Sequence, residues 1–405
     1  MLDDFGQRIR DIILSEMDLS RELSDEEICD LIGSVVSREA RDRPMTIKDR
    51  AELELTIFNS LRKLDVLQEL VDDRDVTEIM VNGPNDIFYE KAGRIQRFKG
   101  HFSSEEKLED VIQQIVGRHN RVVNQASPIV DTRLSDGSRV NIVLNPISIG
   151  GSAVSIRKFP EHPMSMERLV EIEALSPEVA RLLQILTQAK YNIFISGGTG
   201  SGKTTFLNAL SQYIPDDERI ITIEDSAELQ LLGAKNIVRL ETRNANTDGV
   251  TPITIRDLIR TALRMRPDRI IVGECRGAEA LDMLQAMNTG HDGSLSTGHA
   301  NSPHDIISRI ETMVLQGQDF PLNAIRQQIA SGIDIIVQLG RLRDKSRRVL
   351  EISEVDGFMD GEIVLHTLYR FEETAVLDSG RIQGFLKKAG TLCHTDKLMA
   401  AGLSV

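Results

Sequence analysis

A run of eight residues, Gly197–Thr204, carries the clearest chemical signal in the chain. It fits the spacing Gly-x-x-x-x-Gly-Lys-Thr, in which successive backbone N–H groups surround a phosphate. We expect Lys203 to reach the β- and γ-phosphates of ATP and Thr204 to ligate Mg²⁺. The predicted nucleotide-binding residues are Gly197, Gly198, Thr199, Gly200, Ser201, Gly202, Lys203, Thr204 and Thr205.

The surroundings of this run matter, because a glycine-rich turn can match so short a pattern by chance. An apolar strand is predicted at 192–196, directly before the run, and a helix near 203–213 follows it. Three more strands are predicted near 220–223, 236–240 and 269–273, with helices near 254–265 and 277–288. This alternation is typical of a mostly parallel sheet flanked by helices.

Glu274 is the strongest candidate for an acid that acts on the nucleotide. It ends the predicted strand at 269–273, and the carboxyl ends of parallel strands face the ligand in such folds. A carboxylate there holds Mg²⁺ through water or polarises the attacking water. An aspartate usually precedes this glutamate, whereas this chain has Gly273, so a catalytic base is the better assignment. A solvated acid at a strand end is the alternative.

Further acids and two histidines follow other predicted strand ends. Glu224, Asp225 and Glu228 can bring carboxylates toward one metal–nucleotide site, although helix capping by Asp225 is a competing explanation. His291 and His299 lie in a run of small and hydroxyl residues without the spacing of a zinc site. That run is interpreted as a polar loop that reports the γ-phosphate.

Arginines are expected to complete such a site, because phosphoryl transfer builds negative charge on the γ-phosphate. Arg139 and Arg157 lie on predicted strands of the preceding domain and are candidates to reach over the nucleotide; Arg133 is a weaker third. From the residues alone, each is better explained as an ordinary surface arginine.

Length and composition bound the remaining possibilities. The 405 residues predict two or three domains, and a net charge of −14 argues against a broad nucleic-acid-binding surface while leaving room for a local basic groove. Three cysteines, Cys29, Cys275 and Cys393, form no C-x-x-C pair, so reduced cytoplasmic thiols are expected. The N-terminus does not have the pattern of a signal peptide, and no segment reaches the roughly eighteen apolar residues of a membrane span.

Three domains are predicted along the chain. Residues 1–62 show only helical periodicity, with a capping box at Ser24-x-x-Glu27, and are interpreted as a helical bundle. Residues 63–160 contain short strands and a helix capped by Ser103, which indicates an α+β domain. A proline-containing linker at 160–163 leads into 161–405, the α/β domain with a C-terminal extension.

Four ordered motifs give the chain a resemblance to a known family. They are the glycine run, the acidic box at 222–230, the strand with Glu274 at 263–277, and the histidine box at 289–301. The chain resembles the type II/type IV secretion-system ATPases, and more closely the ATPase of tight-adherence (Tad/Flp) pilus assembly. The tetracysteine zinc module of many type II relatives has no counterpart here, which favours the tight-adherence or conjugation-like branches.

The resemblance implies a fold and a set of roles. It implies a RecA-like P-loop ATPase domain, preceded by a smaller α+β domain and the helical bundle, in a homohexameric ring. ATP turnover would move these domains and drive inner-membrane platform proteins of a pilus or secretion machine, with the ring held peripherally at the cytoplasmic face of the inner membrane by those partners. By the same resemblance Glu274 and Glu228 serve catalysis, His291 and His299 sense the nucleotide, and Arg139 and Arg157 are arginine fingers.

Two other classes of function remain as alternatives, besides a conjugation or type IV secretion ATPase. One is a nucleotide-gated scaffold that hardly hydrolyses ATP, against which the presence of Glu274 argues. The other is a RecA-like nucleic-acid motor. No basic loop with interleaved aromatic residues supports that motor, so no specific nucleic-acid partner is expected.

Overall fold

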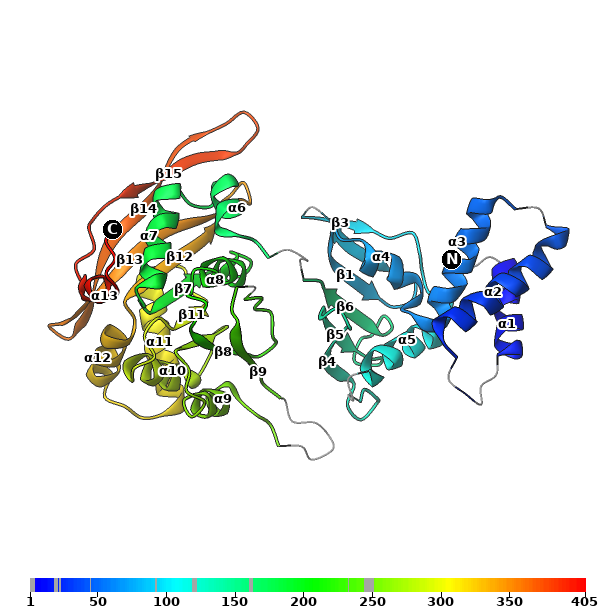
Figure 1. Ribbon diagram of the computed structural model, residues 1–405, viewed down its shortest axis with the longest axis horizontal. Coiled ribbons are helices and arrows are strands. Elements are labelled where there is room, and N and C mark those ends of the chain that lie inside the picture. Colours follow the sequence, from blue (N-terminus) through cyan, green and yellow to red (C-terminus); the bar gives the residue numbers. More distant parts are fainter. Residues whose placement is uncertain are drawn as a thin grey trace. The chain divides into compact units, whose positions relative to one another are not determined.

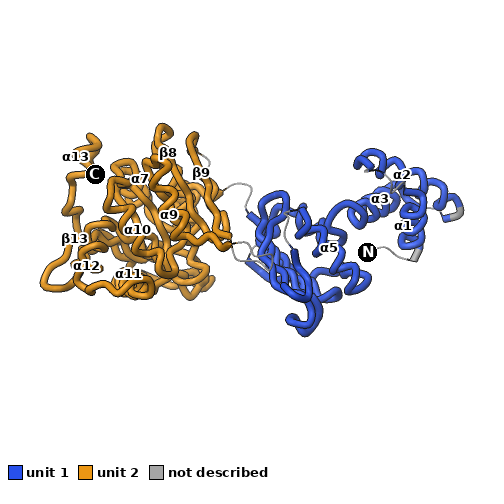
Figure 2. Tube along the Cα trace, turned by 90° about the horizontal axis from the view of Figure 1, so that it is seen from below, with its two compact units in different colours: residues 1–161 blue, residues 162–405 orange. Residues whose placement is uncertain are grey.

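The computed structural model divides the chain into two compact units, Met1–Glu161 and His162–Val405 (Figure 2). It describes residues 4–17, 21, 23–43, 45–91, 93–118, 122–159, 163–231, 233–243 and 251–405. The predicted linker at 160–163 lies outside these ranges except for Pro163, and the three-part division of the chain stays a prediction. Within the described residues, no helix is both long enough and apolar enough to cross a membrane.

The first unit begins with the predicted helices. They are α1 (Asp4–Glu16), α2 (Asp25–Glu39), the 3₁₀ turn η1 (Ala40–Asp42) and α3 (Ile47–Arg62). The capping box at Ser24 and Glu27 is confirmed, and Thr46 with Asp49 forms a second one before α3. Each box satisfies backbone N–H groups that have no partner within the first turn of the helix. Buried isoleucine and valine side chains from the three helices pack into a small core.

The same unit continues with an antiparallel sheet in the order β3-β2-β1-β6-β5-β4. Its elements are η2 (Asp65–Leu67), α4 (Gln68–Asp72), β1 (Val76–Asn82), β2 (Ile87–Lys91), β3 (Arg94–Arg97), α5 (Glu105–Gly117), β4 (Ile129–Arg133), β5 (Arg139–Val143) and β6 (Ala153–Arg157). The apolar side chains of α5 share one core with those of the sheet. The predicted cap of this helix was one residue off: Ser104, not Ser103, accepts the N–H of Lys107.

The second unit is built on a nine-stranded sheet in the order β15-β14-β13-β12-β7-β11-β10-β8-β9 (Figure 1). The strands are β7 (Ile193–Gly197), β8 (Arg219–Glu224), β9 (Asn236–Glu241), β10 (Arg269–Val272), β11 (Leu295–Gly298), β12 (Ile335–Arg341), β13 (Arg347–Met359), β14 (Glu362–Val376) and β15 (Ile382–Lys388). From β12 to β9 all neighbours are parallel, and β13 to β15 extend the sheet in antiparallel fashion. The predicted parallel sheet is therefore confirmed.

Helices cover both faces of this sheet. They are α6 (Met166–Glu171), α7 (Pro177–Gln188), α8 (Lys203–Ser211), α9 (Ile255–Ala262), α10 (Glu279–Asn288), α11 (Pro303–Gly317), α12 (Leu322–Gly332) and α13 (Asp396–Ala401). Helices α6, α7 and α8 share a core with Ile193 and Ile195 of β7, whereas α9 to α12 share the opposite core with Phe194. The alternation along β7 thus sends successive side chains to opposite faces.

Two buried polar side chains tie together the edge at which the parallel strands begin. Asn192 accepts the N–H groups of Gly293 and Ser294 through its Oδ1 atom, at 2.9 and 3.0 Å. Arg269 is fully buried, forms an ion pair with Glu218, and donates to the carbonyl of Thr187 at 2.7 Å. Because this edge is fixed, the opposite edge presents its loops in a defined arrangement.

Candidate active site at the carboxyl ends of the parallel strands

The glycine loop follows β7, whose five residues are all buried. Gly200 and Gly202 have φ angles of 71° and 95°, values that favour glycine, and α8 begins at the next residue, Lys203. A Cβ atom added to Gly197 would lie 2.7 Å from the carbonyl oxygen of Leu339. At Gly198 and Gly200 the added atom would have no described neighbour within 4 Å. The loop therefore leaves open space above a helix N-terminus, which suits an anion.

Lys203 folds back onto this loop. Its Nζ atom donates to the carbonyl oxygens of Gly197 and Gly198 at 3.1 and 3.2 Å and lies 3.2 Å from Nδ1 of His299. Burial lowers the pKa of this ammonium group; the charge of Glu274 opposes the shift and that of Arg276 adds to it. A nearby anion would stabilise the charged form, so the electrostatic setting of Lys203 favours phosphate binding.

Glu274 lies beside Lys203 and His299, as the predicted strand ends required. Its Oε1 atom is 2.8 Å from Nε2 of His299, but the contact lacks hydrogen-bond alignment, and Oε1 has no hydrogen-bond partner among the described residues. Its Oε2 atom accepts a hydrogen bond from Arg276 at 2.6 Å. One carboxylate oxygen is thus held in place, and the other is buried beside His299 without a hydrogen-bond partner among the described residues.

The protonation state of His299 follows from the same cluster. Burial lowers its pKa first, the charge of Lys203 lowers it further, and Glu274 partly opposes both. The ring is therefore neutral near pH 7, and one of its nitrogens can accept a hydrogen bond. His299 follows β11, Glu274 follows β10 and Lys203 follows the loop after β7, three adjacent strands of the sheet.

The three acids of the acidic box differ in how deeply they are buried. Glu224 is only 3 % exposed, and its Oε2 atom accepts the N–H groups of Glu228 and Leu229 at 2.7 and 2.9 Å. Burial raises the pKa of this carboxyl to about 7, although both hydrogen bonds lower it. Glu224, rather than Asp225, therefore caps the backbone that follows β8.

Asp225 and Glu228 lie nearer the surface. Asp225 is exposed and its Oδ2 atom is 3.6 Å from Nη1 of Arg276, which links the end of β8 to Glu274. Glu228 is half-buried. The predicted catalytic roles of Glu224 and Glu228 stay predictions, and the placement of Glu224 favours a structural contribution.

His291 lies away from this cluster, and the two candidate arginines belong to the first unit. His291 precedes the start of β11, at the edge of the sheet opposite to His299, and its Nδ1 atom lies 3.2 Å from the carbonyl oxygen of Ala286. Arg139 and Arg157 are partners in register on β5 and β6 of the first unit, and Arg139 also pairs with Arg133 on β4. Their neighbours along the strands are buried, so the three arginines share the outward face of that sheet. The sensing and finger roles stay predictions.

Sequence reasoning missed two arginines that touch the site. Arg276, two residues after Glu274, is the ion-pair partner of both Glu274 and Asp225, and its position in the motif was the available signal. Arg347 starts β13 and donates from Nε to the carbonyl oxygen of Gly200 at 2.8 Å. A separation of 147 residues left no local signal for this second contact.

The residues present fit Mg²⁺ bound together with a nucleotide. Oxygen ligands suit this ion, and the hydroxyl of Thr204 and the unpartnered Oε1 of Glu274 are candidates. In the part of the chain that the structure describes, no group of three or more His, Cys, Asp or Glu side chains is placed to hold a metal. Magnesium here would therefore draw its other oxygens from phosphate and water.

Comparison with known proteins agrees with this architecture. Residues 60–383 match the family described as type II/IV secretion system protein. Conjugal transfer protein TrbB of Rhizobium radiobacter is 32 % identical over 314 residues, covering 76 % of this chain and 93 % of that protein. Type IV secretion system protein PtlH of Bordetella pertussis is 33 % identical over 320 residues, covering 73 % and 94 %.

A solved structure shows the same fold. The pilus retraction motor PilT with bound ADP aligns with a TM-score of 0.55 and 22 % identity over 82 % of this chain and 84 % of that one. This likeness confirms the predicted α/β fold class, with a RecA-like domain preceded by a smaller domain. On these grounds the chain belongs to the type II/IV secretion system protein family.

Proposed function

We propose that this chain is an ATPase that hydrolyses ATP to power a secretion or pilus-assembly machine. The observation that carries the proposal is the meeting of Lys203, His299 and Glu274 beside the glycine loop, at the ends of adjacent parallel strands. Phosphoryl transfer needs positioning and charge stabilisation more than covalent chemistry, and this cluster offers both. A scaffold that only binds nucleotide would not need a carboxylate held in this way.

Each residue has a part in this mechanism. The loop N–H groups and Lys203 bind the phosphates, and Lys203 would exchange its present loop carbonyls for phosphate oxygens. Arg276 holds Oε2 of Glu274, which orients Oε1 to accept a proton from the attacking water. Neutral His299 lies 3.2 Å from Lys203 and 2.8 Å from Glu274 and can respond to the γ-phosphate. Bound Mg²⁺ would neutralise charge on the phosphates.

The proposal includes the oligomeric state of the chain and its partners. A homohexamer at the cytoplasmic face of the inner membrane would act on platform proteins there, and tight-adherence (Tad/Flp) pilus biogenesis is the proposed process. Conjugation or type IV secretion is the second candidate, because the relatives named above carry those names. In either case, Arg139 and Arg157 are proposed as fingers for a neighbouring subunit, a role that their shared outward face supports.

Replacement of Glu274 by glutamine tests the function. Glutamine keeps the size but cannot accept the proton, so we expect Glu274→Gln to retain ATP and to lose about 10²-fold or more of its hydrolysis rate. Phosphate release and equilibrium ATP binding are measured on the same samples, with Glu171→Gln, an exposed change on α6, as control. Hydrolysis at the wild-type rate in Glu274→Gln would remove the base assignment.

Mixed rings test the arginine assignment. Arg139→Ala or Arg157→Ala chains are combined with Lys203→Ala chains, and we expect each variant to be inactive alone. If an arginine acts on the nucleotide of the next subunit, mixed rings regain part of the ATPase activity, because some interfaces then hold an intact loop and an intact arginine. Full activity of both arginine variants on their own would contradict the proposal.

A further inference from the structure

A pocket in the first unit lies apart from the glycine loop and has no part in the function proposed above. It has a volume of about 490 Å³, within the range of small-molecule sites. Its lining comes from α1, α3, η2, α4, α5 and the sheet strands β2 and β3 with the segment that follows them. The pocket therefore lies where the helical bundle meets the sheet.

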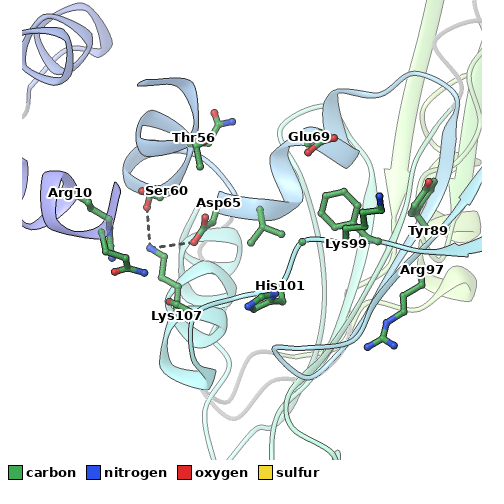
Figure 3. A pocket seen from close by; sticks show the side chains of 16 residues that line it. Arg10, Thr56, Ser60, Asp65, Glu69, Tyr89, Arg97, Lys99, His101 and Lys107 are labelled. Atoms are coloured by element: carbon green, nitrogen blue, oxygen red, sulfur yellow. Dashed lines mark hydrogen bonds and ion pairs between the residues drawn. The ribbon is translucent and has the colours of Figure 1, made fainter. Parts of the chain in front are cut away.

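The two ends of the pocket differ in chemistry (Figure 3). Arg10 and Lys107 lie at one end, and Tyr89, Lys99 and Arg97 lie at the other. The second end also has an aromatic wall, because the rings of Tyr89 and Phe98 contact each other edge to face at a centroid distance of 6.3 Å. A ligand with a charged group and an organic body would match both ends.

Unsatisfied polar atoms mark the end with Arg10. The Nε atom of Arg10 and the Oδ1 atom of Asn59 are buried and have no hydrogen-bond partner within the described residues. Lys107 donates to the carbonyl oxygen of Ser60 at 3.0 Å, whereas its Nζ atom is 3.9 Å from the carboxylate of Asp65. Buried polar atoms usually have partners, and the Nε donor of Arg10 is the one that an anionic ligand group could satisfy, whereas Oδ1 of Asn59 is an acceptor and needs a donor.

The lining of the pocket is basic, although the chain as a whole is acidic. The chain has a net charge of −14, yet the lining holds four Lys or Arg side chains and only two Asp or Glu side chains. Burial lowers the pKa of Lys107, and the charge of Arg10 lowers it further although Asp65 opposes the shift. Arg97 is ion-paired with Asp86, which lies outside the lining, at 2.6 Å, so the pocket keeps an excess of one positive charge, which matches an anionic ligand group.

We propose that this pocket binds a small organic phosphate, with the phosphate at Arg10 and Lys107 and the organic part against Tyr89 and Phe98. Lys107 of α5 already holds the carboxyl end of α3 through its hydrogen bond to Ser60. A ligand bound to Lys107 would therefore strengthen the link between the helical bundle and the sheet. Gln114 of α5 and Arg118, the residue that follows α5, both donate to the carbonyl oxygen of Arg62 at the end of α3 and strengthen that link.

Phenyl phosphate is the probe, since it carries a dianionic group on one aromatic ring. Titration calorimetry with the full chain measures its affinity, and hydrogen–deuterium exchange locates it. We expect protection of peptides that cover 56–69 and 97–107, with 197–204 unaffected. Phenol, which lacks the phosphate, should bind at least tenfold more weakly, because charge-assisted hydrogen bonds are lost.

Two variants test the site by different routes. Arg10→Gln removes a cation whose Nε atom has no hydrogen-bond partner among the described residues, so we expect the fold to be kept while the affinity for phenyl phosphate falls about tenfold or more. Thr56→Phe fills the pocket without a change of charge and should abolish binding. Arg8→Gln on the same helix is the control, because Arg8 does not line the pocket and only pairs with Glu39 at the surface.

The outcomes separate this site from the nucleotide loop. Weaker binding in Arg10→Gln and Thr56→Phe, together with wild-type affinity in Arg8→Gln, supports the proposal. Equal affinity in all four proteins, or protection confined to 197–204, overturns it. ATP hydrolysis is recorded in parallel, so that a failure of the proposed function is seen independently.

Discussion

Glu224 allows the sharpest test of how the acidic box works. It is almost fully buried, and its carboxyl accepts two backbone N–H groups through one oxygen while the other oxygen has no described hydrogen-bond partner. The structure therefore indicates a proton-binding structural group at the end of β8. Replacement by glutamine keeps the shape and the accepting oxygen but cannot ionise.

The expected size of the effect follows from the pKa shift. Burial raises the pKa of Glu224 from 4.5 to about 7, so the folded state binds the proton more tightly than the unfolded state. The free energy of unfolding then falls as the pH rises above about 4.5, and the loss is complete above about 7. At 1.36 kcal/mol per pKa unit the whole loss is about 3 kcal/mol, of which about 2 kcal/mol falls between about pH 5.5 and about pH 8.5.

Denaturant unfolding at several pH values measures this loss. Hydrogen exchange of peptides from β7 and β10 reports the second unit separately from the first. We expect Glu224→Gln to be less sensitive to pH than the wild type by about 2 kcal/mol over that interval, whatever constant offset the amide introduces. Glu241→Gln, its exposed register partner on β9, is the control. An unchanged pH dependence in Glu224→Gln would refute the reasoning.

Two other contacts carry predictions of their own. Glu218→Gln leaves the fully buried Arg269 without its ionic partner, and we expect the free energy of unfolding to fall by about 3 kcal/mol or more, measured by denaturant titration. A loss below about 1 kcal/mol would show that the pair is not holding the sheet edge. Arg347→Gln removes the hydrogen bond to Gly200, and we expect ATP affinity to fall about fivefold, since one such bond contributes about 1 kcal/mol. Arg343→Gln, whose partner is Glu373 at the surface, should bind ATP like the wild type; equal binding by both variants would remove Arg347 from the site.

Those parts of the site that depend on local pattern were predictable from the sequence. The glycine run, the strand before it and the helix after it specify one another over a short stretch, because the backbone conformation needs glycine at Gly200 and Gly202. The parallel order of the strands then places Glu274 and His299 beside Lys203, since the carboxyl ends of parallel strands share one edge.

Features set by tertiary packing were not predictable in this way. The sequence did not distinguish Glu224 from Asp225 as the capping residue, because that choice depends on which side chain the sheet buries. It did not place His291 at the far edge either, since the short strand β11 separates it from His299. The contact of Arg347 required knowledge that β13 returns beside the loop.

Retention of ATP by the purified chain is the most direct test of the central claim. With Mg²⁺ present, equilibrium dialysis against labelled ATP should show saturable binding to the wild type that Lys203→Ala loses, because the loop N–H groups and the lysine hold the phosphates together. Failure of the wild type to retain ATP, or equal retention by Lys203→Ala, would contradict the account.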